Sequence, residues 1–292
     1  MFENSKHWYK GNLHMHTSLS DGQKTPDEAR QFYREAGYDF ISITDHWHMS
    51  KDIPAEKNSG LLELSGAEYD TGDMVTSKIF HILGIGMDKP ALQTPDRRLP
   101  PEEIVKAIRA QHGLAILAHP HWSLMDPGAI RSLNGISGAE VYNSLSDCAF
   151  KNGRRADSSL YFDLWAEKGI YMPAVADDDS HYYMGEQTMS WIWVNSSALT
   201  KPAIMKAIAE GDFYASQGPR FESVRRDGNT LHVCCRDAEK AIFVSNCIWD
   251  EQRVQDVRNG AASYTFSKID TYVRIELMDS NGKLAWFSPV KK

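Results

Sequence analysis

The feature that most limits the fold is an alternation of short apolar runs and helix-like stretches between residues 10 and 210. Runs such as 39-DFISI-43 and 138-GAEVYN-143 are typical of short strands. This alternation predicts parallel strands joined by crossover helices, the pattern of an α/β fold. We expect strands within 12–15, 39–43, 61–68, 79–86, 114–122, 138–143 and 170–176, and helices within 25–37, 101–113, 156–169 and 200–214.

The segment 25-TPDEARQFYREAG-37 has the clearest helix signals. Thr25 occupies the cap position, Pro26 the first helical position, and Glu28 completes a capping box. Gly37 then ends the helix.

Beyond residue 220 the pattern changes to short alternating strands. An Asn281-Gly282 pair near the end predicts a hairpin. We therefore predict an α/β domain over 1–215 and a small all-β, sandwich-like domain over 221–292, with strands near 231–235, 241–246, 262–267, 271–279 and 284–290.

Composition and charge exclude several classes of protein. The 292 residues are 42% hydrophobic and 24% charged, which is ordinary globular composition, and the formal net charge is −7. This acidity disfavours stable binding of duplex nucleic acid and favours a small anionic ligand. No apolar run approaches the roughly 20 residues of a membrane span, and the first residues lack the apolar core of a signal peptide. We expect a cytoplasmic protein with no membrane partner, of unspecified oligomeric state.

Histidines and acidic residues gather at the ends of the predicted strands. The stretch 11-GNLHMHTSLSDG-22 alone contains two histidines and an aspartate. A lone His-x-His pair could simply line a polar pocket, but similar clusters follow most of the other strands. The ends of parallel strands meet at one edge, so the clusters should converge. Imidazole and carboxylate groups together suit zinc, manganese or iron.

The series HMHTSLSDG, TDH, GAE, FHILG, AHPH and DDSH, in this order, resembles the polymerase and histidinol phosphatase (PHP) family over residues 10 to about 215. The tail resembles the β extension of a branch related to carbaryl hydrolase. The resemblance implies a distorted (β/α)7 barrel that holds two or three divalent ions and hydrolyses phosphate esters.

The resemblance also implies a ligand set for a trinuclear metal site. Glu68 would bridge the first and second ions, and Asp21 stands where some family members have histidine. The first ion would be held by His14, His16, Glu68 and Asp179, the second by Glu68, His81 and His119, and the third by Asp21, His46 and His181.

Six further residues receive candidate roles, each with a plainer alternative. Asp45 would orient a ligand histidine or else cap a helix. His48 and His121 would contact the substrate or leaving group, or else be ordinary loop histidines. The arginines that could bind a phosphate, or be solvated surface charges, are Arg154, Arg155 and Arg220.

The chemistry that follows is hydrolysis by a metal-activated hydroxide. The leading prediction is a phosphoesterase acting on a small phosphomonoester or phosphodiester, with nucleotides among the candidate substrates. One alternative is hydrolysis of a carboxylic ester, carbamate or amide at the same site. A second alternative is a non-catalytic, metal-stabilised binding module.

Overall fold

The computed structural model describes residue 1 and residues 6–73, 79–148, 152–257 and 259–292. Four α-helices lie in these residues: α1 (Pro26–Glu35), α2 (Pro101–Ala110), α3 (Ser159–Glu167) and α4 (Lys201–Glu210). The capping box predicted for α1 is present, with Thr25 and Glu28 bonded reciprocally. None of the described helices is long and apolar enough to cross a membrane.

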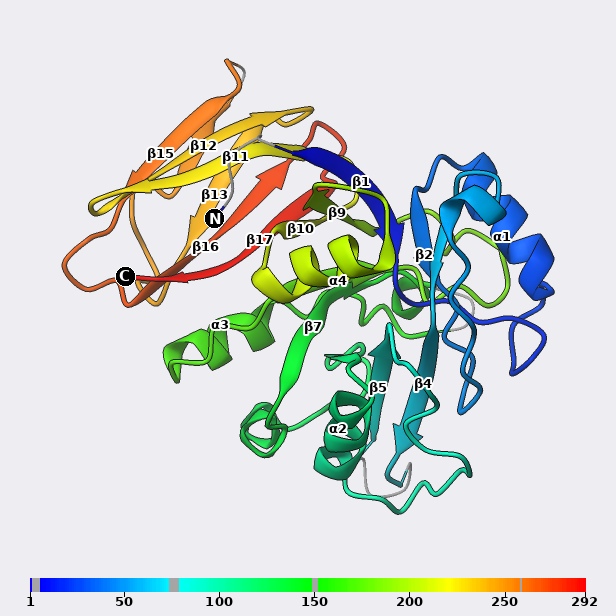
Figure 1. Ribbon diagram of the computed structural model, residues 1–292. Coiled ribbons are helices and arrows are strands. Elements are labelled where there is room, and N and C mark those ends of the chain that lie inside the picture. The colour runs from blue at the N-terminus through cyan, green and yellow to red at the C-terminus, as the bar shows by residue number, and fades with distance from the viewer. Residues whose placement is uncertain (2–5, 74–78, 149–151, 258) are drawn as a thin grey trace.

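The largest sheet has nine strands and passes through the whole molecule (Figure 1). Its order is β14-β13-β16-β17-β10-β9-β1-β2-β3. In chain order these strands are β1 (His7–Asn12), β2 (Phe40–Ser42), β3 (Leu62–Leu64), β9 (Trp191–Ser196), β10 (Phe213–Ser216), β13 (Lys240–Val244), β14 (Val254–Asp256), β16 (Tyr272–Met278) and β17 (Leu284–Lys291).

A second sheet has five strands in the order of the chain. β5 runs antiparallel to both of its neighbours, whereas β6, β7 and β8 are parallel. The strands are β4 (Gly66–Thr71), β5 (Phe80–Ile85), β6 (Leu114–Leu117), β7 (Ile136–Asn143) and β8 (Ala174–Asp177).

Single-residue bridges connect these two sheets at two points. His46 pairs with Glu68 between the ends of β2 and β4, and Met15 pairs with Ser180 beyond β1 and β8. Apolar side chains from both sheets, including Phe40 of β2 and Ile116 of β6, are buried in a common core. The α/β class is confirmed. However, the ladders of the described strands do not close into the expected seven-stranded barrel, because the contacts at both junctions are isolated bridges rather than continuous pairing.

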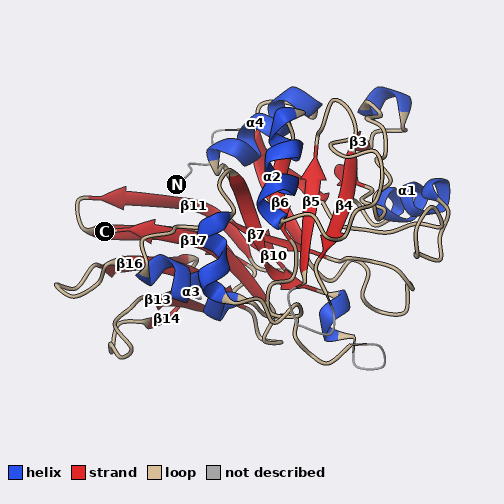
Figure 2. Ribbon diagram, turned by 90° about the horizontal axis from the view of Figure 1, so that it is seen from below, coloured by secondary structure: helices blue, strands red, loops and turns tan. Residues whose placement is uncertain are grey.

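The C-terminal strands form two layers. A three-stranded sheet of β11 (Arg220–Asp227), β12 (Thr230–Arg236) and β15 (Ala261–Thr265) accompanies the C-terminal end of the nine-stranded sheet. Phe243 from one sheet stacks on Tyr264 from the other, with ring centroids 5.1 Å apart, within a separate apolar cluster. Both views show these strands on the side of the molecule opposite α1 (Figure 2).

Long-range pairing explains where the predicted elements are wrong. The helix expected to reach residue 214 ends at Glu210, where Gly211 takes a left-handed φ of 76°, and the chain then enters β10. The strand expected at 12–15 is β1 and ends earlier, at Asn12. Both β1 and β10 pair antiparallel with β9, which lies outside the strands predicted from the sequence.

Candidate metal centre

A cavity of about 520 Å³ opens where the strand ends of the two sheets meet. Its floor is formed by predicted ligands, and its walls include Trp122, Tyr182 and Arg97. Seven of the nine predicted ligands line the cavity directly: Asp21, His46, Glu68, His81, His119, Asp179 and His181. His14 and His16 lie beneath this floor and are fully buried.

Strand direction explains how the ligands reach one place. His14 and His16 follow the end of β1, and His119 follows β6. His81 is instead the second residue of β5, but β5 runs antiparallel, so its beginning lies at the same edge as the ends of the parallel strands. Glu68 lies within β4, opposite the His46 bridge.

Glu68 is the central carboxylate of the cluster. Its Oε2 atom lies 3.0 Å from His16 Nε2, and its Oε1 atom lies 2.9 Å from His81 Nδ1. The rings of His14, His46 and His119 approach the same carboxylate at 3.4, 3.4 and 3.6 Å. Five imidazoles therefore surround one buried acid, which is the arrangement expected of a carboxylate shared between cations.

Asp179 forms the second acidic centre. Its Oδ1 atom is 3.1 Å from His14 Nε2 and 3.4 Å from His16 Nε2. The same two imidazole nitrogens are only 3.2 Å apart. There is room for at most one proton between these two Nε2 atoms. At least one of them therefore has a free lone pair, which can accept that proton or bind a cation.

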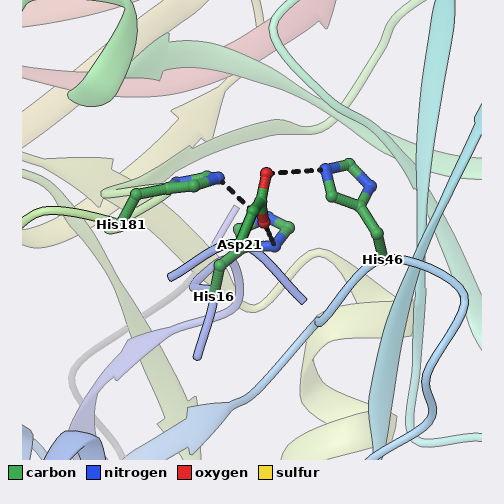
Figure 3. Close-up of side chains that lie close together, drawn as sticks. All are labelled: His16, Asp21, His46 and His181. Atoms are coloured by element: carbon green, nitrogen blue, oxygen red, sulfur yellow. Dashed lines mark ion pairs between the residues drawn. The ribbon is translucent and has the colours of Figure 1, made fainter. Parts of the chain in front are cut away.

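Asp21 lies between three histidines on the more exposed side of the cluster (Figure 3). Its carboxylate lies 3.4 Å from His16 Nδ1, 3.4 Å from His181 Nε2 and 3.8 Å from His46 Nε2. The Asp21 side chain is 54% exposed, so this part of the cluster faces solvent.

The nine donors fit divalent ions, although they overlap more than the predicted grouping. His16 joins Asp21, His46 and His181 in one group whose donor atoms all lie within 4.8 Å of one another, so the third predicted set gains a member. The remaining groups are His14 with His16 and Asp179, His14 with Glu68 and His119, and His46 with Glu68 and His81. Nitrogen and carboxylate oxygen donors in such small groups are what zinc, manganese and iron require.

The close acids and imidazoles favour each other's charged forms, so the pKa values of His14, His16 and His46 are raised despite burial. Burial raises the pKa of Glu68, but the rings of His14, His81 and His46 outweigh it and hold that pKa well below the ordinary value. Asp179 behaves in the same way, chiefly because of His14. Burial lowers the pKa of His81, with Glu68 opposing it only in part. Ionised carboxylates and a neutral imidazole are the forms that bind metal.

The described hydrogen bonds of the Asp45 carboxylate are with a turn and not with a ligand histidine. Asp45 accepts hydrogen bonds from the Thr17 backbone N–H, the Thr17 hydroxyl and the Ser20 hydroxyl at 2.7, 2.6 and 2.7 Å, and so holds the turn that carries Asp21. The carboxylate on a second histidine nitrogen is Glu140, 2.7 Å from His14 Nδ1. Sequence reasoning missed Glu140 because a single acid inside a predicted strand gave no signal.

The other candidate residues lie away from the cavity. His48 and His121 are not among the described residues that line the cavity. The His121 ring instead donates a hydrogen bond to the Asp157 carbonyl. Arg154 and Arg155 are exposed outside that lining. Arg220, at the start of β11, stacks on Trp193 of β9, 4.4 Å from the ring centroid.

Arg97 and Asp70 line the cavity although neither was predicted. They form an ion pair with each other. Asp70 also lies 3.3 Å from His46 Nδ1 and accepts a 2.7 Å hydrogen bond from the Trp47 indole. Arg97 comes from a loop between β5 and α2, so only the folded chain reveals its position.

The fold and the clustered donors define an α/β protein with a candidate multinuclear metal centre. No family model matches the chain. It is 25% identical over 147 residues to an uncharacterized protein of Methanocaldococcus jannaschii, covering 46% of this chain and 82% of that relative.

Two solved structures share the architecture. One is a two-domain protein of Bacteroides vulgatus that contains a predicted PHP-like metal-dependent phosphoesterase; it covers 98% of this chain and 96% of its own, at 17% identity and a TM-score of 0.56. The other is a lesion-specific endonuclease of Pyrococcus furiosus, covering 89% and 69% at 14% identity and a TM-score of 0.51. The PHP resemblance of the motifs is thus confirmed at the level of the fold.

Proposed function

We propose that the protein is a metal-dependent hydrolase of small phosphate esters, with a dinuclear or trinuclear site of zinc, manganese or iron. The observation that carries the proposal is the convergence of nine imidazole and carboxylate side chains, from strands far apart in sequence, at the base of one cavity. Bound divalent ions would activate water and neutralise the charge of a phosphoryl group.

Glu68 would be the central ligand of the metal site, and the other donors would complete the coordination of each ion. We assign Glu68 as the carboxylate shared between cations, because five imidazole rings lie within 3.6 Å of its oxygens. The donors of the remaining positions would be His14, His16, Asp21, His46, His81, His119, Asp179 and His181.

The cavity walls would select the substrate. The Trp122 ring packs against His119 and His81, with centroids 4.8 and 5.7 Å apart, and gives the wall above the donors an apolar face. Arg97 places a cation at the same cavity. A phosphorylated molecule with a compact organic group, such as a nucleotide, has the matching chemistry.

We further propose that the two parts of the chain have different roles. Residues 1–215 would form a PHP-like metallohydrolase domain and carry the chemistry, since all nine donors lie there. Residues 221–292 would be a small all-β domain that supports this part without contributing to the chemical step.

The decisive experiment combines metal analysis with a substrate panel. We expect two to three transition-metal ions per chain after metal-replete expression, and hydrolysis of phosphomonoesters or phosphodiesters that chelator abolishes. Hydrolysis only of carboxylic esters, carbamates or amides would replace the proposed substrate class. Full metal content without any hydrolysis would favour a binding module.

Glu68→Gln tests the shared carboxylate. The variant keeps the side-chain volume but removes the negative charge between the cations, so it should lose at least one ion and about a hundredfold or more in turnover. Glu63→Gln is the matched control, because Glu63 is also fully buried but pairs with Arg30. If Glu68→Gln keeps every ion and normal turnover, the assignment of Glu68 is wrong.

A further inference from the structure

Beneath the donor cluster, two fully buried polar residues of β7 contact three different predicted ligands. Glu140 and Asn143 are both 0% exposed, and neither lines the cavity. We propose that this pair, the Glu140–Asn143 bracket, positions the metal ligands and fixes the proton on His14. The inference rests on the proposed function and concerns residues outside the predicted ligand set.

A bulge in β7 brings the two side chains together. Residues three apart in a regular strand point to opposite faces of the sheet. The pairing of β7 with β8 shifts register between Glu140 and Tyr142, which inserts one residue. Glu140 and Asn143 consequently share one face, and Asn143 Nδ2 donates to Glu140 Oε2 at 2.8 Å.

The bracket contacts ligands that follow three different strands. Glu140 Oε1 lies 2.7 Å from His14 Nδ1, and Glu140 Oε2 accepts a 2.8 Å hydrogen bond from the His119 backbone N–H. Asn143 Nδ2 donates to Asp179 Oδ2 at 3.2 Å. One pair of side chains therefore links the segments after β1, β6 and β8.

Two of these ligands have backbone conformations that non-glycine residues seldom adopt. His119 has a φ of 26° and Asp179 a φ of 52°. Such conformations persist only where surrounding contacts enforce them. The hydrogen bond to the His119 N–H and the one to the Asp179 carboxylate are contacts of that kind.

The acceptor pattern of Glu140 sets the tautomer of His14. An ionised carboxylate can only accept, so beside Glu140 the proton of a neutral His14 belongs on Nδ1. The Nε2 lone pair would then be free for a metal ion held near Glu68 and Asp179. A glutamine at this position has only one acceptor oxygen. Its amide would either donate to His14 Nδ1, moving the proton to Nε2, or face the donors of His119 and Asn143.

The test uses Glu140→Gln in the full chain, loaded with cobalt as the probe. The affinity for Co²⁺, measured by competition with a chelator, should fall about ten- to a hundredfold, and the visible absorption spectrum of the bound cobalt should change. Glu63→Gln, an equally buried carboxylate variant that pairs with Arg30, should keep the wild-type affinity and spectrum. Wild-type affinity and spectrum in Glu140→Gln, or equal losses in both variants, would overturn the inference.

A second variant covers the case in which Glu140→Gln does not fold. Asn143→Ser removes the amide that donates to Glu140 and Asp179, and it should weaken Co²⁺ binding about tenfold. Unchanged affinity in a folded Asn143→Ser protein would overturn the bracket. If the wild type binds cobalt but hydrolyses no phosphate ester, the proposed function is wrong and the test of the bracket still holds. If the wild type binds no cobalt, both the proposed function and the bracket are wrong.

Discussion

At the scale of single residues, the position of Arg97 leads to a prediction about substrate binding. Its guanidinium lines the cavity and pairs with Asp70. Because a charge-assisted bond to a phosphoryl oxygen contributes about 1.5–3 kcal/mol, Arg97→Ala should raise KM at least about tenfold and change kcat much less. Steady-state kinetics with the preferred phosphate ester would measure both.

The neighbouring arginine provides the control for Arg97. Arg98 is 91% exposed and pairs with Asp96 on the surface. Arg98→Ala should therefore leave KM unchanged, as should Arg155→Ala, although Arg155 was a candidate from the sequence. An unchanged KM in Arg97→Ala would mean that this arginine serves only to hold Asp70.

The sequence predicts the donors better than the groups around them. His14, His16 and Glu68 belong to ordered motifs whose types and spacing already indicate metal binding. Glu140 and Arg97 stand in no motif, and their roles arise from a strand bulge and from a loop that returns to the cavity. Those placements depend on tertiary packing, which single-sequence patterns do not encode.

At the scale of elements, β1 contains a lysine in an unusual setting. Lys10 Nζ lies 4.0 Å from the ring centroid of Tyr38 and 4.0 Å from that of Trp191. Burial, partly opposed by Asp178, lowers the pKa of Lys10 to about 8. An unfolded lysine keeps its proton up to a pKa of about 10.4. Between these values the unfolded chain binds more protons than the native chain.

This difference gives the stability a defined pH dependence. Between the two pKa values the unfolded state binds the extra proton, so the contribution of Lys10 to the free energy of unfolding rises with pH. Below pH 8 the native state carries the charge of Lys10 in a partly desolvated position, which is unfavourable. The Tm of the wild type, relative to that of Lys10→Met, should therefore rise between pH 7 and pH 9.5. A Tm difference that stays constant over this range would contradict the prediction.

Local signals account for some elements and not for others. α1 is predicted closely because its capping box and proline act within four residues of sequence. β9 and β10 are missed because a strand in the middle of a sheet is specified by its neighbours, and β9 pairs with β1 and β10 from distant parts of the chain. Glu68 of β4 likewise pairs with His46 through a bridge that no local signal in the sequence predicts.

At the scale of the whole molecule, the C-terminal strands are part of the main structure. Trp286 of β17 is 2% exposed, belongs to the core cluster of the α/β part, and stacks on Tyr142 with centroids 5.5 Å apart. Arg274 of β16 donates to Asp163 of α3 at 2.7 and 2.8 Å. A chain that ends at Arg220 should accordingly be insoluble, despite containing all nine proposed ligands.

A pair of tryptophan variants tests this coupling without truncation. Trp286→Ala should lower the free energy of unfolding by about 3–5 kcal/mol, because it leaves a cavity in the core of the α/β part. Trp249→Ala should change it by less than about 0.5 kcal/mol, since that side chain belongs to a residue that is 72% exposed. Urea denaturation measures both, and similar values for the two variants would show that β17 is dispensable.

The strand order of the nine-stranded sheet also determines when a newly made chain can fold. β1 is made well before β9, with which it pairs, whereas its other neighbour, β2, follows soon after it. The edge of β1 that pairs with β9 must therefore stay unpaired until residue 196 has been made, and such an exposed edge favours aggregation. The donors His14 and His16 meet Asp179 and His181 only after β8 has been made, so the proposed metal site cannot form before residue 181 has been made.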